Sequence, residues 1–265
     1  MTKYGQAFVV GLQSNLVYRW NFAVRSLFWF CHLILIFILW GAAYSGNASI
    51  GGYSFAQTLT YFAVIFVLQF FVGAFNEDYQ ISEDIRNGLI NQFLLKPINY
   101  FAYRLSVFAA ARVVSGAFGL LALVVALPLF RGYIDLPHDA WRVAVGVPAM
   151  LMTGIIQFSI AYIFGLLAFW FLEIQGFVVL SMSVEMLLGG QIVPLDLLPG
   201  AVFNVVRFTP FFYQAYFPAA ILTGRKGLDF ALQGLAIQAV WAIILVFLAE
   251  AVWRRGLRHH TAAGG

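Results

Sequence analysis

No Asp, Glu, Lys or Arg occurs between Ser26 and Asn76, and this gap limits what the chain can fold into more than any other feature. A soluble domain has about one charged residue in four. Here charged residues are 10% of the chain and hydrophobic residues are 62%. So few charged side chains cannot cover the surface of a soluble fold. The sequence therefore predicts an all-α membrane protein that crosses the bilayer several times.

Six apolar runs are long enough to be membrane-spanning helices, because a span needs about 20 predominantly apolar residues. They cover residues 26–44, 53–75, 105–130, 143–172, 174–193 and 230–252. The fourth run is longer than a bilayer requires, so we expect that helix to tilt or to protrude. Together they predict a single transmembrane domain that occupies residues 1–265.

The distribution of Lys and Arg predicts the orientation of these spans, because cytoplasmic segments of membrane proteins carry an excess of basic residues. With both termini in the cytoplasm, ten of the fifteen basic residues lie on that side. The exterior side then holds only Arg131, Arg142, Arg207, Arg225 and Lys226. We therefore expect an even number of spans and two cytoplasmic termini. The net charge of +4 fits these flanks and does not indicate nucleic-acid binding.

Residues 1–25 precede the first span and have their own pattern. Apolar side chains recur at helical spacing at Phe8, Val9, Leu12, Leu16, Trp20 and Val24. This spacing predicts an amphipathic helix that lies at the inner membrane interface. A simple flanking extension of the first span is the alternative.

Residues 190–227 lie between the fifth and sixth predicted spans and fit neither a loop nor a span. The segment is too apolar for an exposed loop, and it is interrupted at Gly189, Gly190, Pro194, Pro199 and Pro210. Non-helical backbone at membrane depth is tolerated only where protein or water satisfies it. We expect short re-entrant or surface-lying helices that dip into the outer leaflet, with an ordinary exterior loop as the alternative.

Residues 76–104 form the one strongly charged segment, with Glu77, Asp78, Glu83 and Asp84 in its first half. Its apolar residues Ile81, Ile85, Leu89 and Phe93 are spaced by four, and Ile90 and Leu94 widen the stripe. This pattern predicts a helix with one apolar face, capped by Ser82 and ended by Pro97, with Gly88 marking a close approach or a break. The helix could rest on the inner leaflet or contact a protein. Because an anionic leaflet repels acidic side chains, the charges favour a protein partner.

Glu185 is the most unusual residue within the predicted spans. It lies about 18 Å from Glu173 along a helix, near the middle of the bilayer. Intramembrane carboxylates are costly and often functional. Glu185 could line a translocation path, bind a cationic group, or brace its helix through Gln157 or Gln69. No metal-ligand cluster or nucleophile–base pair appears at a plausible spacing, so no metal site or catalytic residue is predicted.

The segment ISEDIRNGLINQFLLKPINYFAYRL resembles the loop after the second span in permeases of the bacterial type-2 ABC exporter family. The similar positions are a D-I-R-x-G pattern at Asp84, Ile85, Arg86 and Gly88, followed by Leu94, Leu95 and Pro97. The segments GGQIVPLDLLPG and PFFYQAYFPAAILTG are similar to the exterior segment before the last span of that family. The resemblance extends over nearly the whole chain.

This resemblance implies a permease subunit in a bacterial cytoplasmic membrane that pairs with a second permease chain, identical or related. Separate ATP-binding cassette subunits would carry ATP and Mg²⁺, and this chain itself has no phosphate-binding loop motif and would hold no cofactor. The loop after span two would be the coupling helix, with contact residues Glu83, Asp84, Ile85, Arg86, Gly88, Leu94, Lys96 and Pro97. The expected activity is export of an amphiphilic, lipid-like or drug-like substrate. An ATP-independent carrier or channel with a proton or cation site at Glu185 is the alternative.

Overall fold

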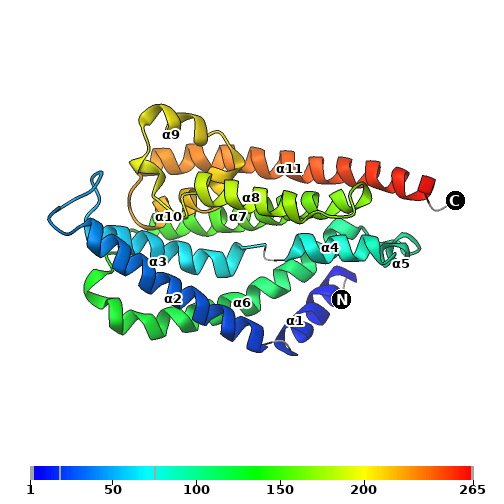
Figure 1. Cartoon of the computed structure of the whole chain (residues 1–265), viewed down its shortest axis with the longest axis horizontal. Coiled ribbons are helices and arrows are strands. Elements are labelled where there is room, and N and C mark those ends of the chain that lie inside the picture. The colour runs from blue at the N-terminus through cyan, green and yellow to red at the C-terminus, as the bar shows by residue number, and fades with distance from the viewer. Residues whose placement is uncertain (1–2, 18, 75, 264–265) are drawn as a thin grey trace.

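The computed structural model describes residues 3–17, 19–74 and 76–263, and these residues are almost entirely helical (Figure 1). The α-helices are α1 (Lys3–Val17), α2 (Arg19–Ala43), α3 (Phe55–Val72), α4 (Glu77–Arg86), α5 (Ile90–Leu94), α6 (Tyr100–Phe130), α7 (Ala140–Leu166), α8 (Gln175–Leu188), α9 (Gly200–Val206), α10 (Tyr216–Leu222) and α11 (Leu228–Ala263). Four 3-10 turns connect them: η1 (Arg131–Tyr133), η2 (Leu167–Phe169), η3 (Leu195–Leu197) and η4 (Pro210–Tyr213). The all-helical class is confirmed.

The long helices place the connecting segments at two opposite ends of the molecule. At one end lie α1, the α4–α5 segment and the carboxyl end of α11, and at the other lie α9 and the turn between α2 and α3 (Figure 1). Five helical stretches of the described chain are long and apolar enough to cross a membrane: 20–43, 55–86, 100–125, 140–169 and 228–259.

The fifth predicted span differs from the prediction. The structure forms only α8 there, a helix of 14 residues. At 1.5 Å per residue this helix is about 21 Å long, less than the hydrocarbon thickness of about 30 Å. Six full spans are therefore not confirmed: the described residues contain five helical stretches long and apolar enough to cross a membrane, and α8 is a shorter apolar helix.

The amino-terminal helix is also shorter than its apolar pattern predicts. It ends at Val17, and α2 begins at Arg19, so Trp20 and Val24 belong to the first long helix. Helix α1 packs along α6, where Gly11 is buried and an added Cβ would lie 3.0 Å from the Cβ of Ala110. The small residue at this point lets the two helices approach closely.

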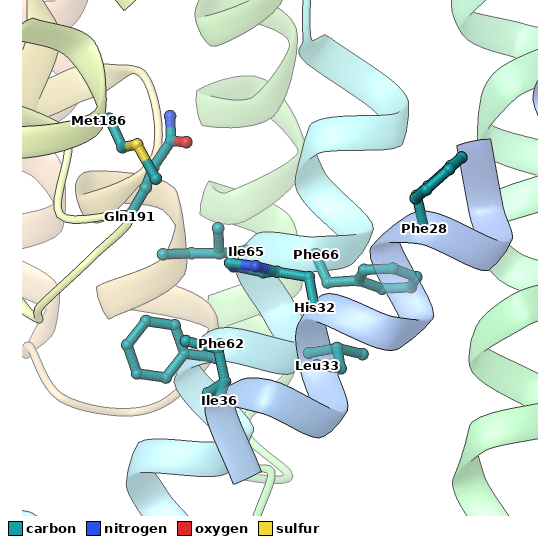
Figure 2. Close-up of a pocket in the computed structure, with 9 residues that line it drawn as sticks. All are labelled: Phe28, His32, Leu33, Ile36, Phe62, Ile65, Phe66, Met186 and Gln191. Atoms are coloured by element: carbon teal, nitrogen blue, oxygen red, sulfur yellow. The ribbon is translucent and has the colours of Figure 1, made fainter. Parts of the chain in front are cut away.

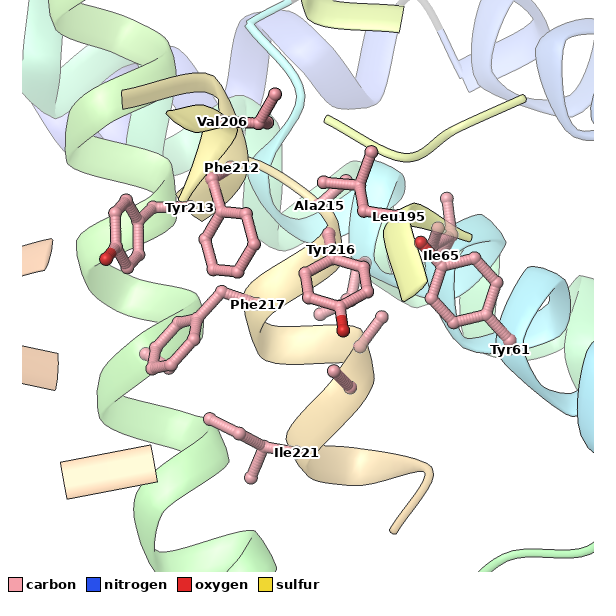
Figure 3. Close-up of a cluster of buried hydrophobic side chains, with 14 of the residues drawn as sticks. Tyr61, Ile65, Leu195, Val206, Phe212, Tyr213, Ala215, Tyr216, Phe217 and Ile221 are labelled. Atoms are coloured by element: carbon pink, nitrogen blue, oxygen red, sulfur yellow. The ribbon is translucent and has the colours of Figure 1, made fainter. Parts of the chain in front are cut away.

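Residues 190–227 form a folded insert rather than a surface loop. Helix α10 is buried at residues 216–221 against α3 and α7, and its residues Tyr216 and Phe217 belong to the largest apolar cluster of the described chain (Figure 3). The irregular backbone before it is satisfied by neighbouring helices. Thr153 Oγ1 in α7 donates to the carbonyl of Tyr213 at 2.7 Å, and Gln238 Nε2 in α11 donates to Thr153 Oγ1 at 3.0 Å. The apolar, broken sequence is thus explained by burial inside the protein.

Helix α4 follows α3 after a turn in which Asn76 adopts a left-handed φ of 63°. It packs against α7 at Gly165, where an added Cβ would lie 2.8 Å from the carbonyl oxygen of Asp78. The predicted cap at Ser82 is wrong, because this residue lies inside α4 and its Oγ donates to the carbonyl of Tyr79.

We expect Gly165→Ala to lower the thermal stability of the purified protein, because the new methyl group collides with the backbone of α4. Overpacking of this kind costs about 1–3 kcal/mol. The matched control is Gly176→Ala in α8, where nothing lies within 4 Å of the added Cβ. Melting in detergent should separate the two variants, and equal melting temperatures would contradict the close α4–α7 contact.

Candidate functional site

A short turn between α4 and α5 exposes several leucines. Gly88 has a φ of +69°, which a side chain disfavours, and there the chain leaves α4 and enters α5. The exposed residues around this turn are Glu83, Arg86, Asn87, Leu89, Asn91, Gln92, Leu94, Leu95, Lys96 and Pro97, and we call them the α5 tip. Leu95 is 88% exposed, far more than a leucine in a folded core. The tip therefore presents leucines to the surroundings within a polar rim.

The predicted apolar face of this segment is mostly used inside the protein. Ile81, Ile85 and Ile90 are buried, and they belong to a cluster with residues of α6, α7 and α11. The single helix expected through Phe93 is broken at Gly88, so Leu89 and Leu94 turn away from that cluster and are 42% and 44% exposed. Of the predicted contact residues, Ile85 is therefore inaccessible to a partner.

A buried polar network holds α4 against α6. Arg104 Nη2 donates to Glu77 Oε2 at 3.0 Å and to Gln80 Oε1 at 2.9 Å, and Nη1 lies 3.6 Å from Asp84 Oδ2. Tyr100 Oη donates to the same Asp84 oxygen at 2.5 Å. These contacts consolidate the base of the α5 tip.

This network corrects the interpretation of the acidic residues. Glu77 and Asp78 are buried, Asp84 is half-buried, and only Glu83 of the four is exposed. Most of the charge that seemed to favour an external protein partner is thus used within the chain. The spacing of Glu77, Gln80 and Asp84 places all three on one face of a helix. This polar face could have indicated from the sequence that a basic residue of the same chain binds there.

Two further contacts connect the α5 tip to the rest of the molecule. The ammonium group of Lys3 in α1 donates to the carbonyl of Pro97, and the backbone N–H of Asn99 donates to Tyr4 Oη at 3.2 Å. Arg86 Nη1 lies 3.9 Å from Glu173 Oε1 in the turn that precedes α8. The tip is therefore in contact with both the amino-terminal helix and the start of α8.

Glu185 lies in α8 and is hydrogen-bonded by two amides. Gln157 Nε2 in α7 donates to its Oε1 at 2.8 Å, and Gln191 Nε2 donates to the same oxygen at 3.0 Å. The bracing contact through Gln157 is present, whereas Gln69 is buried in α3 and has no hydrogen bond to Glu185 in the described residues. Gln191 was not predicted, although it lies six residues after Glu185, just beyond the end of the helix. It also lines a pocket between α2, α3 and α8 (Figure 2).

A second polar cluster lies at the opposite end, around Asp196 in η3. Tyr53 Oη and Tyr216 Oη donate to its carboxylate at 2.7 Å and 2.6 Å, and Lys226 Nζ lies 2.7 Å from it. Arg225 stacks over the Tyr53 ring at 3.7 Å and donates to the carbonyl of Gly52 at 3.0 Å. These contacts join three segments that the sequence showed only as separate polar residues. Of the predicted interruptions, Gly189 and Gly190 end α8, Pro194 and Pro199 flank η3, and Pro210 begins η4.

Burial alone raises the pKa of Asp196. Hydrogen bonds from Lys226, Tyr216 and Tyr53 outweigh that effect, so the pKa of this carboxyl lies below its ordinary value of 3.8. The group is therefore a stable carboxylate that holds the cluster together at neutral pH.

A family model described as ABC-2 family transporter protein matches residues 30–264, almost the entire chain. The chain belongs to the ABC-2 transporter family. Members of this family are membrane transport components of ABC transporters that work with ATP-binding subunits and are not themselves the ATPase. No curated protein matches the chain. The resemblance of the chain to type-2 ABC permeases is thereby confirmed at the level of the family.

We expect Arg104→Met to destabilise this ABC-2 transporter strongly, because the change leaves the Glu77 carboxylate buried without its guanidinium partner. Removal of one member of a buried pair costs about 3–5 kcal/mol. The double variant Arg104→Met, Glu77→Gln should regain part of this loss in a melting experiment in detergent.

The control for Arg104→Met is Arg254→Met. Arg254 pairs with Glu250 on the surface of α11, where its side chain is 71% exposed. Exposed pairs of this kind contribute about 0–1 kcal/mol. An Arg104 variant that melts no lower than the Arg254 variant would contradict the role given to the buried network.

The Asp196 cluster predicts a loss of stability in acid. The pKa of Asp196 is lower in the folded protein than in the unfolded chain. The contribution of this carboxylate to the free energy of unfolding is therefore complete above the unfolded pKa. That contribution is lost as the pH falls through the lower, folded pKa. Melting temperatures between pH 7 and pH 3 should therefore fall less steeply for Asp196→Asn than for the unaltered transporter. Parallel curves would show that this carboxylate does not stabilise the fold.

Proposed function

We propose that this chain is the permease subunit of an ATP-driven exporter in a bacterial cytoplasmic membrane, with both termini in the cytoplasm. A separate ATP-hydrolysing subunit, which carries ATP and Mg²⁺, docks on the α5 tip. The observation that carries this proposal is an exposed apolar tip on a rigid, internally bonded base. Membership of the ABC-2 family supports the same arrangement, since such permeases work with ATP-binding subunits.

The chemistry of the α5 tip suits a protein groove. Leu89, Leu94 and Leu95 supply apolar contact area, while Arg86 and Lys96 provide a polar rim. Interfaces commonly have an apolar centre of this kind surrounded by polar groups. Asp84 and Ile85 act differently from the rest of the predicted contact residues. Both support the tip from inside, Asp84 through Tyr100 and Ile85 through the buried cluster.

Movement of the tip would reach the membrane helices through two routes. Helix α4 packs tightly on α7 and is connected to α3 by the turn at Asn76, so a displaced tip would shift the inner ends of α3 and α7. The Arg86–Glu173 contact touches the start of α8. Because this pair is exposed, its own energy is small, and the packed α4–α7 contact carries the coupling.

The substrate path lies between two permease chains, this one and an identical or related copy. Helices α2 and α8 leave apolar faces uncovered in the single chain, with Leu35 and Leu180 63% and 62% exposed. Helix α8 also carries the half-buried Glu185, which lipid alone would solvate poorly. A second copy over α2 and α8 would cover this carboxylate and enclose a path for an amphiphilic molecule.

The alternative of an ATP-independent carrier rests on Glu185 alone. In that case purified protein in liposomes would drive proton- or cation-coupled uptake without nucleotide or any ATPase subunit, and Glu185→Gln would abolish it. Uptake that needs ATP and the second subunit would reject this alternative.

We expect Leu95→Ala to weaken binding of an ATP-hydrolysing subunit that is encoded near this chain's gene and co-expressed with it. Truncation of an exposed apolar anchor at an interface centre costs about 2 kcal/mol, or roughly thirtyfold in affinity. The control is Leu228→Ala, since Leu228 is 44% exposed at the start of α11, at the other end of the molecule. Affinity can be measured with both variants in nanodiscs. Unchanged binding by Leu95→Ala would reject docking on the α5 tip.

A further inference from the structure

The pocket between α2, α3 and α8 has the composition of a binding site. It has a volume of about 300 Å³, and its walls are formed by Phe28, His32, Leu33 and Ile36 of α2, by Phe62, Ile65 and Phe66 of α3, and by Met186 and Gln191 (Figure 2). Most of these side chains are apolar or aromatic. The pocket therefore suits a hydrophobic body, and the polar residues in its wall are His32 and Gln191.

The carboxyl group next to this pocket is that of Glu185. Gln191, which lines it, donates to the carboxylate of Glu185, and no Lys or Arg is among the described residues that form its walls. The two hydrogen bonds to Glu185 both reach Oε1 and both come from amide N–H groups. In the described part of the chain no basic side chain lies within ion-pair distance of Glu185, since each ion pair there involves another carboxylate.

A carboxylate without a basic partner, beside an aromatic pocket in an apolar medium, favours one class of ligand over others. A cation gains electrostatic attraction that grows as the local dielectric constant falls. Aromatic rings add attraction for positively charged groups, above all for quaternary ones that shed water easily. An anion would meet repulsion from Glu185, and a neutral molecule would gain nothing from it.

We infer that this pocket binds hydrophobic cations, with the positive group held by the Glu185–Gln191 pair and the apolar body held by α2 and α3. The inference deepens the proposed export function, on which it rests, by assigning a cationic amphiphile as the class of substrate. Gln157 acts as a positioning residue that holds the carboxylate from the α7 side, at 2.8 Å.

The test uses the full chain in lipid nanodiscs and two ions of nearly equal size and shape but opposite charge, tetraphenylphosphonium and tetraphenylborate. Equilibrium binding is measured and the signal of empty nanodiscs is subtracted. Glu185→Gln should weaken phosphonium binding about tenfold or more and leave borate binding unchanged or stronger. The control Glu173→Gln removes an exposed carboxylate from the turn before α8 and should leave the binding of both ions unchanged.

A second variant, Met186→Trp, fills the pocket and should block phosphonium binding without removing any charge. The inference is overturned if phosphonium binds no better than to empty nanodiscs, if Glu185→Gln affects both ions equally or neither, or if Met186→Trp leaves binding intact. Docking of the ATP-hydrolysing subunit is measured in the same nanodiscs. Intact docking without cation binding rejects only this inference, whereas lost docking rejects the proposed function.

Discussion

The structure depends on one constraint, that a break in a helix inside lipid must be satisfied by side chains of neighbouring helices. Three helix ends among the described residues have such a donor. Arg112 of α6 donates to the carbonyl of Gly73 after α3, Tyr61 of α3 donates to Gly190 after α8, and Thr153 of α7 donates to Tyr213 before α10. These bonds allow short helices to exist among the long ones, and the proposed functional features lie beside those breaks.

The two ends of the molecule use charge for opposite purposes. Near the α5 tip, Arg104 gathers carboxylates of α4 into the interior and leaves the exposed surface mostly to leucines and a few rim charges. Around Asp196, one carboxylate collects hydroxyl and ammonium donors from three separate segments. The Arg104 network supports an exposed surface that can contact a partner. The Asp196 cluster connects separate segments at the opposite end of the molecule. Between them, Glu185 accepts hydrogen bonds from two amides and has no ion pair among the described residues.

Much of the architecture follows from the sequence because it depends on local properties. Long apolar runs predict long helices, and the membrane class follows from the scarcity of charge. The broken segment 190–227 was also predicted to enter the apolar layer, although α10 lies deeper than expected, within the protein core. The length of α8 was overestimated, because residues 189–193 carry no charge and read as a continuation of the helix, whereas Gly189 and Gly190 end it. Hydropathy measures apolar character, and it does not reveal whether apolar residues continue a helix or turn into a packed insert.

The sequence by itself determined the membrane class, the positions of most helices, the existence of a charged segment after the second apolar run, and an acidic residue within an apolar helix. Only the tertiary structure decided which of the acidic side chains are paired inside the protein and which are accessible to a partner or ligand. Glu77 and Asp84 are turned inward by Arg104, a residue more than 15 positions away in the chain, whereas Glu185 meets amides from α7 and the turn after α8. A side chain's partner depends on distances between helices, and spacing along one helix cannot supply those distances.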